Sequence, residues 1–324
     1  MRILVALVTA SLLSLGAPGQ VAHAQEYPNR PIRLIVPFTL GGNVDITART
    51  IAPALSALLG QNIIVENRAG AGGTLGADIV AKAAPDGYTL LMGSNSTVSV
   101  APALYTRNPY HPIKDFAPIT LVAATPFVLI AHPSVPAATA AELVTLAKAQ
   151  PDTLTMGSGG NGSSNHLVGE LFQSVTGTRL RHVPYKGASA AAADLMGGQV
   201  QLLFDQLSAS TANIQGGRIR ALAVSSPERS PVVPAVPTLS ELGIKGMDVI
   251  NITGLLAPAG TSKAIVTRLN EATLKALDQA EIRDRFNQLG VQPIGGTPQA
   301  FADYIREDLA RWTQVIKDGN IKVD

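Results

Sequence analysis

The chain contains no cysteine, and only 4% of its 324 residues are aromatic and 15% are charged. Without cysteine there is no disulfide framework, no thiolate nucleophile, no cysteine-ligated metal and no lipid anchor on a cysteine. Scarce aromatic residues argue against a surface that stacks bases or sugars. The net charge of +2, with no basic stripe, gives no sign of nucleic-acid binding. What is present is 46% hydrophobic residues, enough for two domains with buried cores.

The first residues have the pattern of a secretory signal peptide. Arg2 supplies a positive charge, residues 3–15 are apolar, and Ala22-His23-Ala24 forms a small-residue cleavage site. The apolar run is shorter than the roughly 20 residues that span a membrane. We therefore expect residues 1–24 to be removed after Ala24. The mature protein, without disulfides or a lipid anchor, is then expected to work in a bacterial periplasm.

Short apolar runs alternate with helical patterns along the mature chain. The first runs cover residues 32–36, 62–65 and 88–92, with helical spacing between them, which predicts parallel strands in a β-α-β-α-β order. A second alternation extends from about residue 140 to residue 224, and three helices are expected after it. The predicted fold class is α/β, with parallel-rich sheets that are flanked by helices.

Two apolar stretches indicate how the chain divides into two lobes. Residues 116–130 form two apolar runs split by Thr125-Pro126, which we interpret as the segment that leaves the first lobe. The apolar stretch 249–257 is expected to return to it, so that two crossover strands act as a hinge. The predicted bounds are 25–124 and 250–324 for lobe 1, which is discontinuous, and 125–249 for lobe 2.

Three loops rich in glycine or serine follow predicted strands and precede predicted helices, where open α/β sheets bind ligands. In the first loop, Gly41-Gly42 would let an anion approach the free amides and the positive dipole of a helix start. The alternative is an ordinary turn with Asn43 or Asp45 as the N-cap. The other loops cover residues 157–166 and 185–189. One loop from lobe 1 facing two from lobe 2 predicts a ligand-binding cleft between the lobes.

Several side chains near these loops have two possible roles. His166 could cap its helix or hydrogen-bond a ligand. Asp205 closes an apolar run, and it could bond the loop amides or accept a cationic group of the ligand. Lys186 places a positive charge beside the cleft unless it is only solvated. Asp45 is expected to cap its helix unless the ligand also carries an amine.

The sequence offers little for catalysis. It contains no G-x-S-x-G, no H-E-x-x-H and no P-loop, and its histidines lack metal-ligand spacing. The segment 70–76 departs from G-x-G-x-x-G because Leu75 replaces the third glycine. We therefore expect no cofactor, no metal and no enzymatic activity. An exported hydrolase that uses Ser163, Ser164 or His166 is the alternative, and a receptor that signals to a sensor protein is another.

Several stretches together resemble one family, the tripartite tricarboxylate transporter substrate-binding proteins, also called Bug or TctC-like receptors. The similar stretches are 27–38 with Gly41-Gly42 and Asp45, 65–73, Ala84-Pro85-Asp86-Gly87-Tyr88-Thr89-Leu90, Val183-Pro184-Tyr185-Lys186-Gly187 and Leu256-Ala257-Pro258-Ala259-Gly260-Thr261. The resemblance covers nearly the whole mature chain. It implies a two-lobed periplasmic binding protein fold of type II, monomeric, that closes on a small carboxylate and delivers it to a membrane permease.

The resemblance also implies which residues bind the ligand. A carboxylate would be held between the first loop and the loop after the Tyr-Lys-Gly strand, largely by backbone groups and water, with polar contacts from the glycine-serine loop. The predicted ligand-binding residues are Phe38, Leu40, Gly41, Gly42, Asn43, Asp45, Ser94, Ser158, Asn161, Ser164, His166, Lys186, Gly187, Ala188, Ser189 and Asp205. Thr39-Leu40 and Ile252-Thr253 depart from the family pattern at the pocket wall, so the class of acid (di- or tricarboxylate, amino acid or aromatic acid) stays open.

Overall fold

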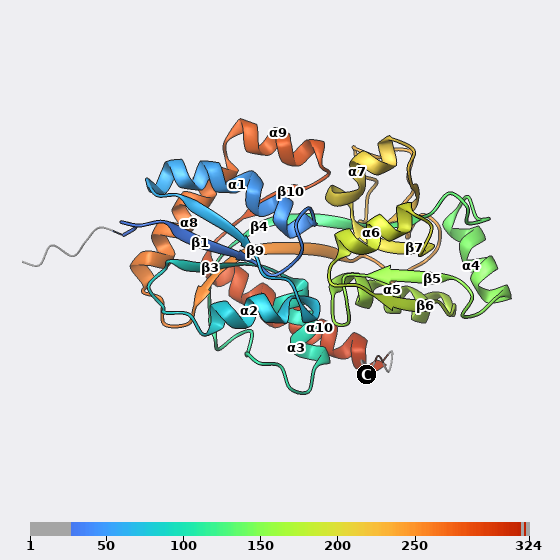
Figure 1. The fold of residues 1–324 in the computed structure, drawn as a ribbon, viewed down its shortest axis with the longest axis horizontal. Coiled ribbons are helices and arrows are strands. Elements are labelled where there is room, and N and C mark those ends of the chain that lie inside the picture. The colour runs from blue at the N-terminus through green and yellow to red at the C-terminus, as the bar shows by residue number, and fades with distance from the viewer. Residues whose placement is uncertain (1–26, 319–320, 322–324) are drawn as a thin grey trace, which may run out of the picture.

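The computed structural model describes residues 27–318 and residue 321, and in this part of the chain ten strands form one mixed sheet (Figure 1). The predicted signal peptide, residues 1–24, lies outside the described residues. Within them, no helix is long and apolar enough to cross a membrane. Helices cover both faces of the sheet, which confirms the predicted α/β class.

The first half of the sheet combines three parallel strands with antiparallel neighbours. Its strands are β1 (Ile32–Val36), β2 (Ile63–Asn67), β3 (Thr89–Ser94), β9 (Ile250–Pro258) and β10 (Gln292–Gly295). The order is β2-β1-β3-β9, and β9 then pairs with β4 (Phe116–Ala131). In the second half, β7 (Leu202–Gln206), β5 (Thr155–Ser158) and β6 (Arg181–Pro184) are parallel, and β8 (Arg220–Val224) pairs with β4.

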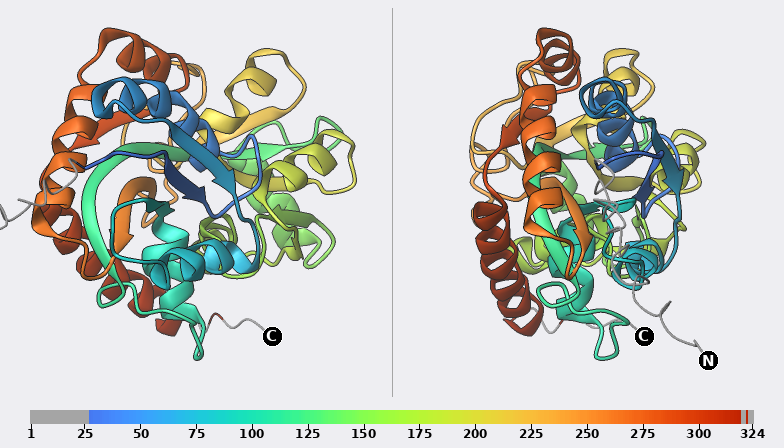
Figure 2. Two further views of the ribbon diagram at one scale, coloured as in Figure 1. Left: turned by 60° about the vertical axis from the view of Figure 1, so that its left-hand side comes forward. Right: turned by 90° about the vertical axis from the view of Figure 1, so that its left-hand side faces the viewer.

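Strand β4 belongs to both halves of the sheet. Its residues up to Pro126 pair with β9, and its residues from Phe127 onward pair with β7. The strand therefore continues through Thr125-Pro126, where the sequence indicated a break between two runs. Pro126 is tolerated because only β9 pairs with it. Strand β10 pairs with β4 up to Ala124, and β7 and β8 pair with β4 from Phe127 and Val128 onward, so the missing amide of the proline costs little. The strand curves, and the sheet is curled (Figure 2).

Each half of the sheet is a three-layer sandwich. Alternating side chains of β4 supply both faces in the second half: Phe127 and Leu129 pack in one core, and Val128 and Ile130 in the other. The helices that cover the first half are α1 (Asn43–Leu59), α8 (Lys263–Leu277) and α9 (Ala280–Gln288) on one face and α2 (Thr74–Ala81) and α10 (Pro298–Asp318) on the other. Those of the second half are α4 (Ala140–Ala149) and α5 (Ser164–Thr176), opposite α6 (Ala188–Met196) and α7 (Leu207–Gln215).

The last helix contacts both halves. Near its start, Phe301 and Ile305 pack with β1 and β3 in the first half. Further along, Trp312 is 1% exposed and belongs to the core that lies under α4 and α5. The short helix α3 (Ala101–Leu104), which follows β3, packs beside this part of α10. Helix α10 is therefore a third connection between the halves, in addition to β4 and the chain that returns into β9.

Phe301 provides a test of the packing in the first half. Its ring fills the space over Gly254, where an added Cβ atom would lie 2.3 Å from the ring. Replacing Phe301 with Ala leaves a cavity, and we expect the free energy of unfolding to fall by about 3–5 kcal/mol in denaturant titrations. The control is Gln299→Ala, at an exposed position of the same helix. Equal losses in the two variants would contradict this packing.

Candidate functional site

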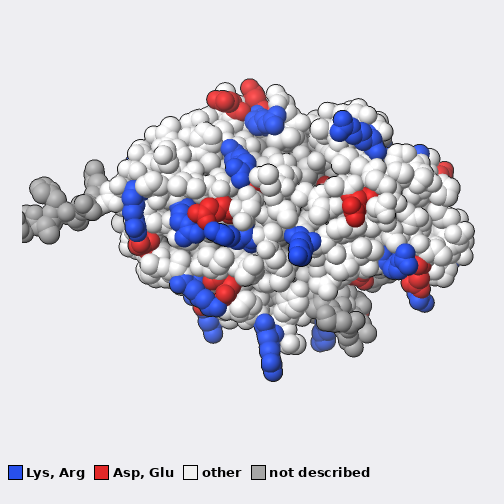
Figure 3. All heavy atoms as spheres, viewed as in Figure 1, with Lys and Arg blue, Asp and Glu red and all other residues white. Residues whose placement is uncertain are grey.

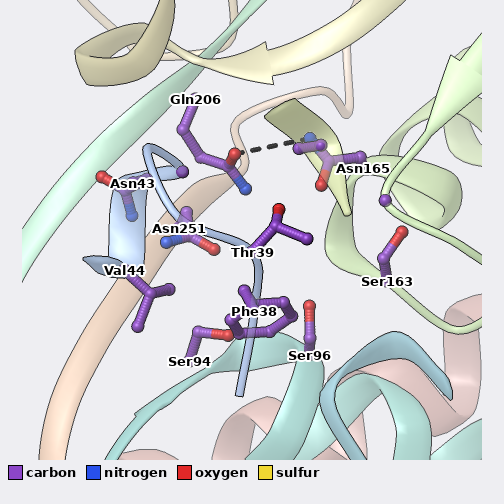
Figure 4. Close-up of a pocket in the computed structure, with 13 residues that line it drawn as sticks. Phe38, Thr39, Asn43, Val44, Ser94, Ser96, Ser163, Asn165, Gln206 and Asn251 are labelled. Carbon is purple, nitrogen blue, oxygen red and sulfur yellow. Dashed lines mark hydrogen bonds between the residues drawn. The ribbon is translucent and has the colours of Figure 1, made fainter. Parts of the chain in front are cut away.

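A cavity lies between the two halves of the sheet (Figure 4). The space between its atoms, together with the solvent at its mouth, is about 380 Å³. The residues from the first half are Phe38, Thr39, Gly42, Asn43, Val44, Ser94, Ser96 and Asn251, and those from the second half are Gly159, Ser163, Asn165, Ala188 and Gln206. All but Asn251 lie at or just after the carboxyl ends of parallel strands, where α/β sheets bind ligands.

Four helices begin at this cavity. The N-caps of α1 and α6 are Gly42 and Gly187, which have no side chain, and the side chain of Gln206, the N-cap of α7, accepts no hydrogen bond from the first-turn amides. At α5, Ser163 is the N-cap and accepts from the amide of His166. The free amides and the dipole of a helix start favour negative charge. Two halves of the molecule therefore direct the positive ends of helices at one enclosed space.

Eight of the thirteen residues around the cavity have polar side chains, and none of these side chains is charged. None of the thirteen described lining residues is Asp, Glu, Lys, Arg or His. In the described part of the chain, the amide nitrogens of Asn43 and Asn251 are buried there without a hydrogen-bond partner. Charged side chains instead lie scattered over the outer surface, as the face in Figure 3 shows. The cavity can thus hold an anion through N–H donors, without a cationic side chain.

Hydrogen bonds across the cavity hold the two halves together. Thr39 Oγ1 lies 2.7 Å from Ser189 Oγ, Ser96 Oγ lies 2.7 Å from Ser164 Oγ, and Ser208 donates to Asn43 Oδ1 at 2.7 Å. Glycine permits a further close approach, because a Cβ atom on Gly187 would lie 2.2 Å from Thr39 Oγ1. The structure is therefore a closed arrangement of the two halves.

Asp45 lies beside the first loop and outside the cavity. Its carboxylate accepts bonds from the Gly41 amide, from Arg49 Nε and from Asn67 Nδ2, each at 2.9 Å. The N-cap of α1 is Gly42, so the expectation of Asn43 or Asp45 at that position was wrong. Asp45 stands in the first helical turn and reaches back to the loop. Its role in the structure is to fix the loop whose glycine reaches the cavity.

Asp205 is buried next to the cavity without lining it. Its Oδ2 accepts a hydrogen bond from Ser210 Oγ, while Oδ1 has no partner among the described residues. Burial raises the pKa of Asp205 to about 6. The next residue, Gln206, lines the cavity and accepts a bond from Asn165 Nδ2 at 3.4 Å.

The two histidines of the second half stack on each other below the glycine-serine loop. The rings of His166 and His182 are 4.0 Å apart and nearly parallel, and Ser158 Oγ lies 2.6 Å from His182 Nε2. Burial, with His182 nearby, lowers the pKa of His166 to about 3, and burial lowers that of His182 to about 4. Both rings are therefore neutral at neutral pH. They support the loop and offer no positive charge to a ligand.

The other predicted residues fall into four groups. Phe38, Gly42, Asn43, Ser94 and Ala188 line the cavity, and Ser164, Gly187 and Ser189 form the contacts that close it. Leu40 and Gly41 are exposed on the outer side of the first loop. Asn161 and Lys186 line a separate surface hollow.

Neither Ser163 nor Ser164, the serines of the hydrolase alternative, hydrogen-bonds a histidine ring among the described residues. Ser163 Oγ caps the backbone of His166, Ser164 Oγ bonds Ser96, and His166 Nδ1 faces the Gly162 amide. The same part of the chain contains no cluster of three or more His, Asp or Glu side chains that could hold a metal ion.

Sequence reasoning did not assign several cavity residues. They are Thr39, Val44, Ser96, Gly159, Ser163, Asn165, Gln206 and Asn251. Some of them carried a signal. Asn251 is a polar residue inside an apolar run, and Gln206 directly follows the strand that ends at Asp205. The others stand in or beside the predicted loops.

The fold and the enclosed cavity define a two-lobed solute-binding receptor. The model of the tripartite tricarboxylate transporter family receptor matches residues 47–321, and the chain belongs to this family, as the resemblance implied. Protein BugT of Bordetella pertussis is 36% identical over 321 residues, 99% of this chain and 98% of BugT.

Two solved structures are similar over most of the chain. Rpa4515 of R. palustris with adipate has a TM-score of 0.89 at 36% identity, over 92% of this chain and 99% of that chain. MatC (Rpa3494) from Rhodopseudomonas palustris with bound malate has a TM-score of 0.86 at 37% identity, over 90% and 100%. The predicted two-lobed periplasmic binding protein fold is thereby confirmed.

Asp205 gives rise to a test by pH. Its pKa of about 6 lies above the usual value of about 3.9, so the unfolded chain loses this proton first, and stability falls as the pH rises from about 4 to about 6. Asp205→Asn removes that loss. We expect the melting temperature of the variant to exceed that of the unaltered protein, and this difference to be larger at pH 7.5 than at pH 4.5. Asp284→Asn, at an exposed site, is the control. A gain that is the same at both pH values would contradict the buried carboxyl.

Proposed function

We propose that the protein captures a small organic carboxylate in the cavity and delivers it to a membrane permease of the tripartite tricarboxylate type. The observation that carries this is the convergence of four helix starts on a cavity lined by N–H donors and by no charged residue of the described chain. Its relatives Rpa4515 and MatC, solved with adipate and malate, support a carboxylate ligand.

Capture works through closure of the lobes. The two lobes that we propose are residues 25–124 with 250–324, and residues 125–249. Strand β4 and the chain leading into β9 serve as the hinge between them, and helix α10 also packs against the second lobe through Trp312. A carboxylate held by helix starts of both lobes stabilises the closed state over the open one, as a ligand must to drive closure. In the enclosed cavity these charge-assisted bonds are stronger than in water.

The proposed ligand contacts come from both lobes. The first-turn amides of α1 after Gly42 and of α6 at Ala188 hold the carboxylate, and the side chains of Asn43, Ser94 and Asn251 contact the rest of the ligand. Because the nearby serine hydroxyls serve as a cap and as a closing contact, binding is favoured over hydrolysis. We further propose that the protein is exported to the periplasm, with cleavage after Ala24, and acts as a monomer.

The test is a thermal-shift screen of residues 25–324 against mono-, di- and tricarboxylates and aromatic acids, each beside its uncharged amide. A ligand at 100 times its dissociation constant stabilises by about 2.7 kcal/mol, which raises the melting temperature measurably. We expect at least one acid to stabilise the protein while its amide does not. Stabilisation by the neutral amides alone would count against an anion site.

Closure itself is tested with Gly187→Ala. The backbone of Gly187 is extended, so alanine is accommodated there, but its Cβ atom would lie 2.2 Å from Thr39 Oγ1 across the cavity. Overpacking of this kind costs about 1–3 kcal/mol, which weakens binding by about 5- to 150-fold. We expect this loss in calorimetric titration, with an unchanged melting temperature of the ligand-free protein.

The matched control is Gly197→Ala at the other end of α6, where the nearest atom to an added Cβ is 3.6 Å away. This variant is expected to bind as tightly as the unaltered protein. Undiminished affinity in Gly187→Ala would show that the closed contact between Gly187 and Thr39 plays no part in binding.

A further inference from the structure

Two carboxamide groups in the cavity have unused hydrogen-bonding capacity. Asn251, in β9, is 1% exposed, and within the described residues its side chain forms no hydrogen bond. Asn43, at the start of α1, is 3% exposed, and its amide nitrogen has no partner there either. A buried donor without a partner destabilises a protein, and native structures contain few of them. Two at one cavity point to a ligand that supplies the missing partners.

The neighbours of Asn43 determine which of its atoms faces the ligand. Its Oδ1 accepts hydrogen bonds from Thr125 Oγ1 at 3.0 Å and from Ser208 Oγ at 2.7 Å. The amide nitrogen is therefore the atom of this side chain that lacks a partner among the described residues. Asn251 lies on the same side of the cavity, opposite Ser163 and Asn165 (Figure 4). Together the pair offers two NH₂ groups and one carbonyl oxygen, that of Asn251.

This set of groups complements a hydroxyl. A hydroxyl oxygen accepts two hydrogen bonds and donates one, and so can bond both NH₂ groups and the Asn251 carbonyl. We propose that the ligand is a hydroxy carboxylate whose hydroxyl is bound by Asn43 and Asn251. The proposal rests on the carboxylate-binding function above and makes its ligand class narrower.

The same set of groups disfavours the two closest alternatives. An ammonium group has three donors and no acceptor, so it would face two NH₂ groups. The described cavity lining contains no Asp or Glu that could pair with an ammonium group. The two nearby carboxylates lie outside the lining, where Asp45 bonds Arg49 and Asp205 bonds Ser210. A plain methylene group would leave both amide nitrogens unpaired in the complex. The site should therefore select hydroxy acids over amino acids and over unsubstituted acids.

The experiment compares malate, succinate and aspartate, which share a four-carbon skeleton, in calorimetric titrations of residues 25–324. If five-carbon acids bind better in the thermal-shift screen, 2-hydroxyglutarate, glutarate and glutamate take their place. We expect the hydroxy acid to bind at least tenfold more tightly than the other two. In Asn251→Leu the hydroxy acid should lose this advantage over the unsubstituted acid. Asn287→Leu, at an exposed position of α9, is the control and should keep it.

The ligand-free proteins provide a second readout. Since the Asn251 side chain has no hydrogen bond to lose, Asn251→Leu should melt at the same temperature as the unaltered protein or higher. Equal affinity for the hydroxy and unsubstituted acids, preference for the amino acid, or an advantage that survives in Asn251→Leu would overturn the proposal while carboxylate binding stands. Failure of every acid in the screen would instead remove the carboxylate function on which the proposal rests.

Discussion

The pairing of β4 with β9 is the constraint on which the other features depend. One curved strand supplies backbone partners to both halves of the sheet, and β9 lies beside its first part up to Pro126. Because the parallel strands of each half end toward the other, the loops after β1, β5 and β6 all contribute residues to the intervening cavity. The position of the ligand site is thus set by backbone hydrogen bonds far from the ligand.

The chemistry of the cavity follows from the same arrangement. Helices that begin after these strands direct their free amides inward, so the protein gathers positive potential without burying a cation. A buried lysine or arginine would need a partner whenever the ligand is absent. Uncharged amide donors avoid that difficulty, at the smaller cost of the unpaired nitrogens of Asn43 and Asn251.

Periodicity and turn residues were enough to predict the alternation of strands and helices, and β1 has the predicted bounds. These patterns are local, since they record which face of an element is buried. The continuity of β4 could not be predicted, because the proline that suggests a break is tolerated only where no second strand pairs with it. Asn251 was missed for a related reason. It looks like one polar residue in an apolar run until β9 is placed beside β3 and α1. Asp45 and Asp205 stand out in sequence because they are charged, yet both lie outside the cavity lining, where Asp45 accepts from the first loop and Asp205 accepts from Ser210 of α7.

The lack of charged lining residues also bears on the surroundings in which the receptor can work. Mobile ions screen exposed charges within about 10 Å at 0.1 M salt, but they screen buried groups far less. The attraction here comes from amides that are enclosed once the lobes meet. The affinity for the ligand should consequently depend little on ionic strength.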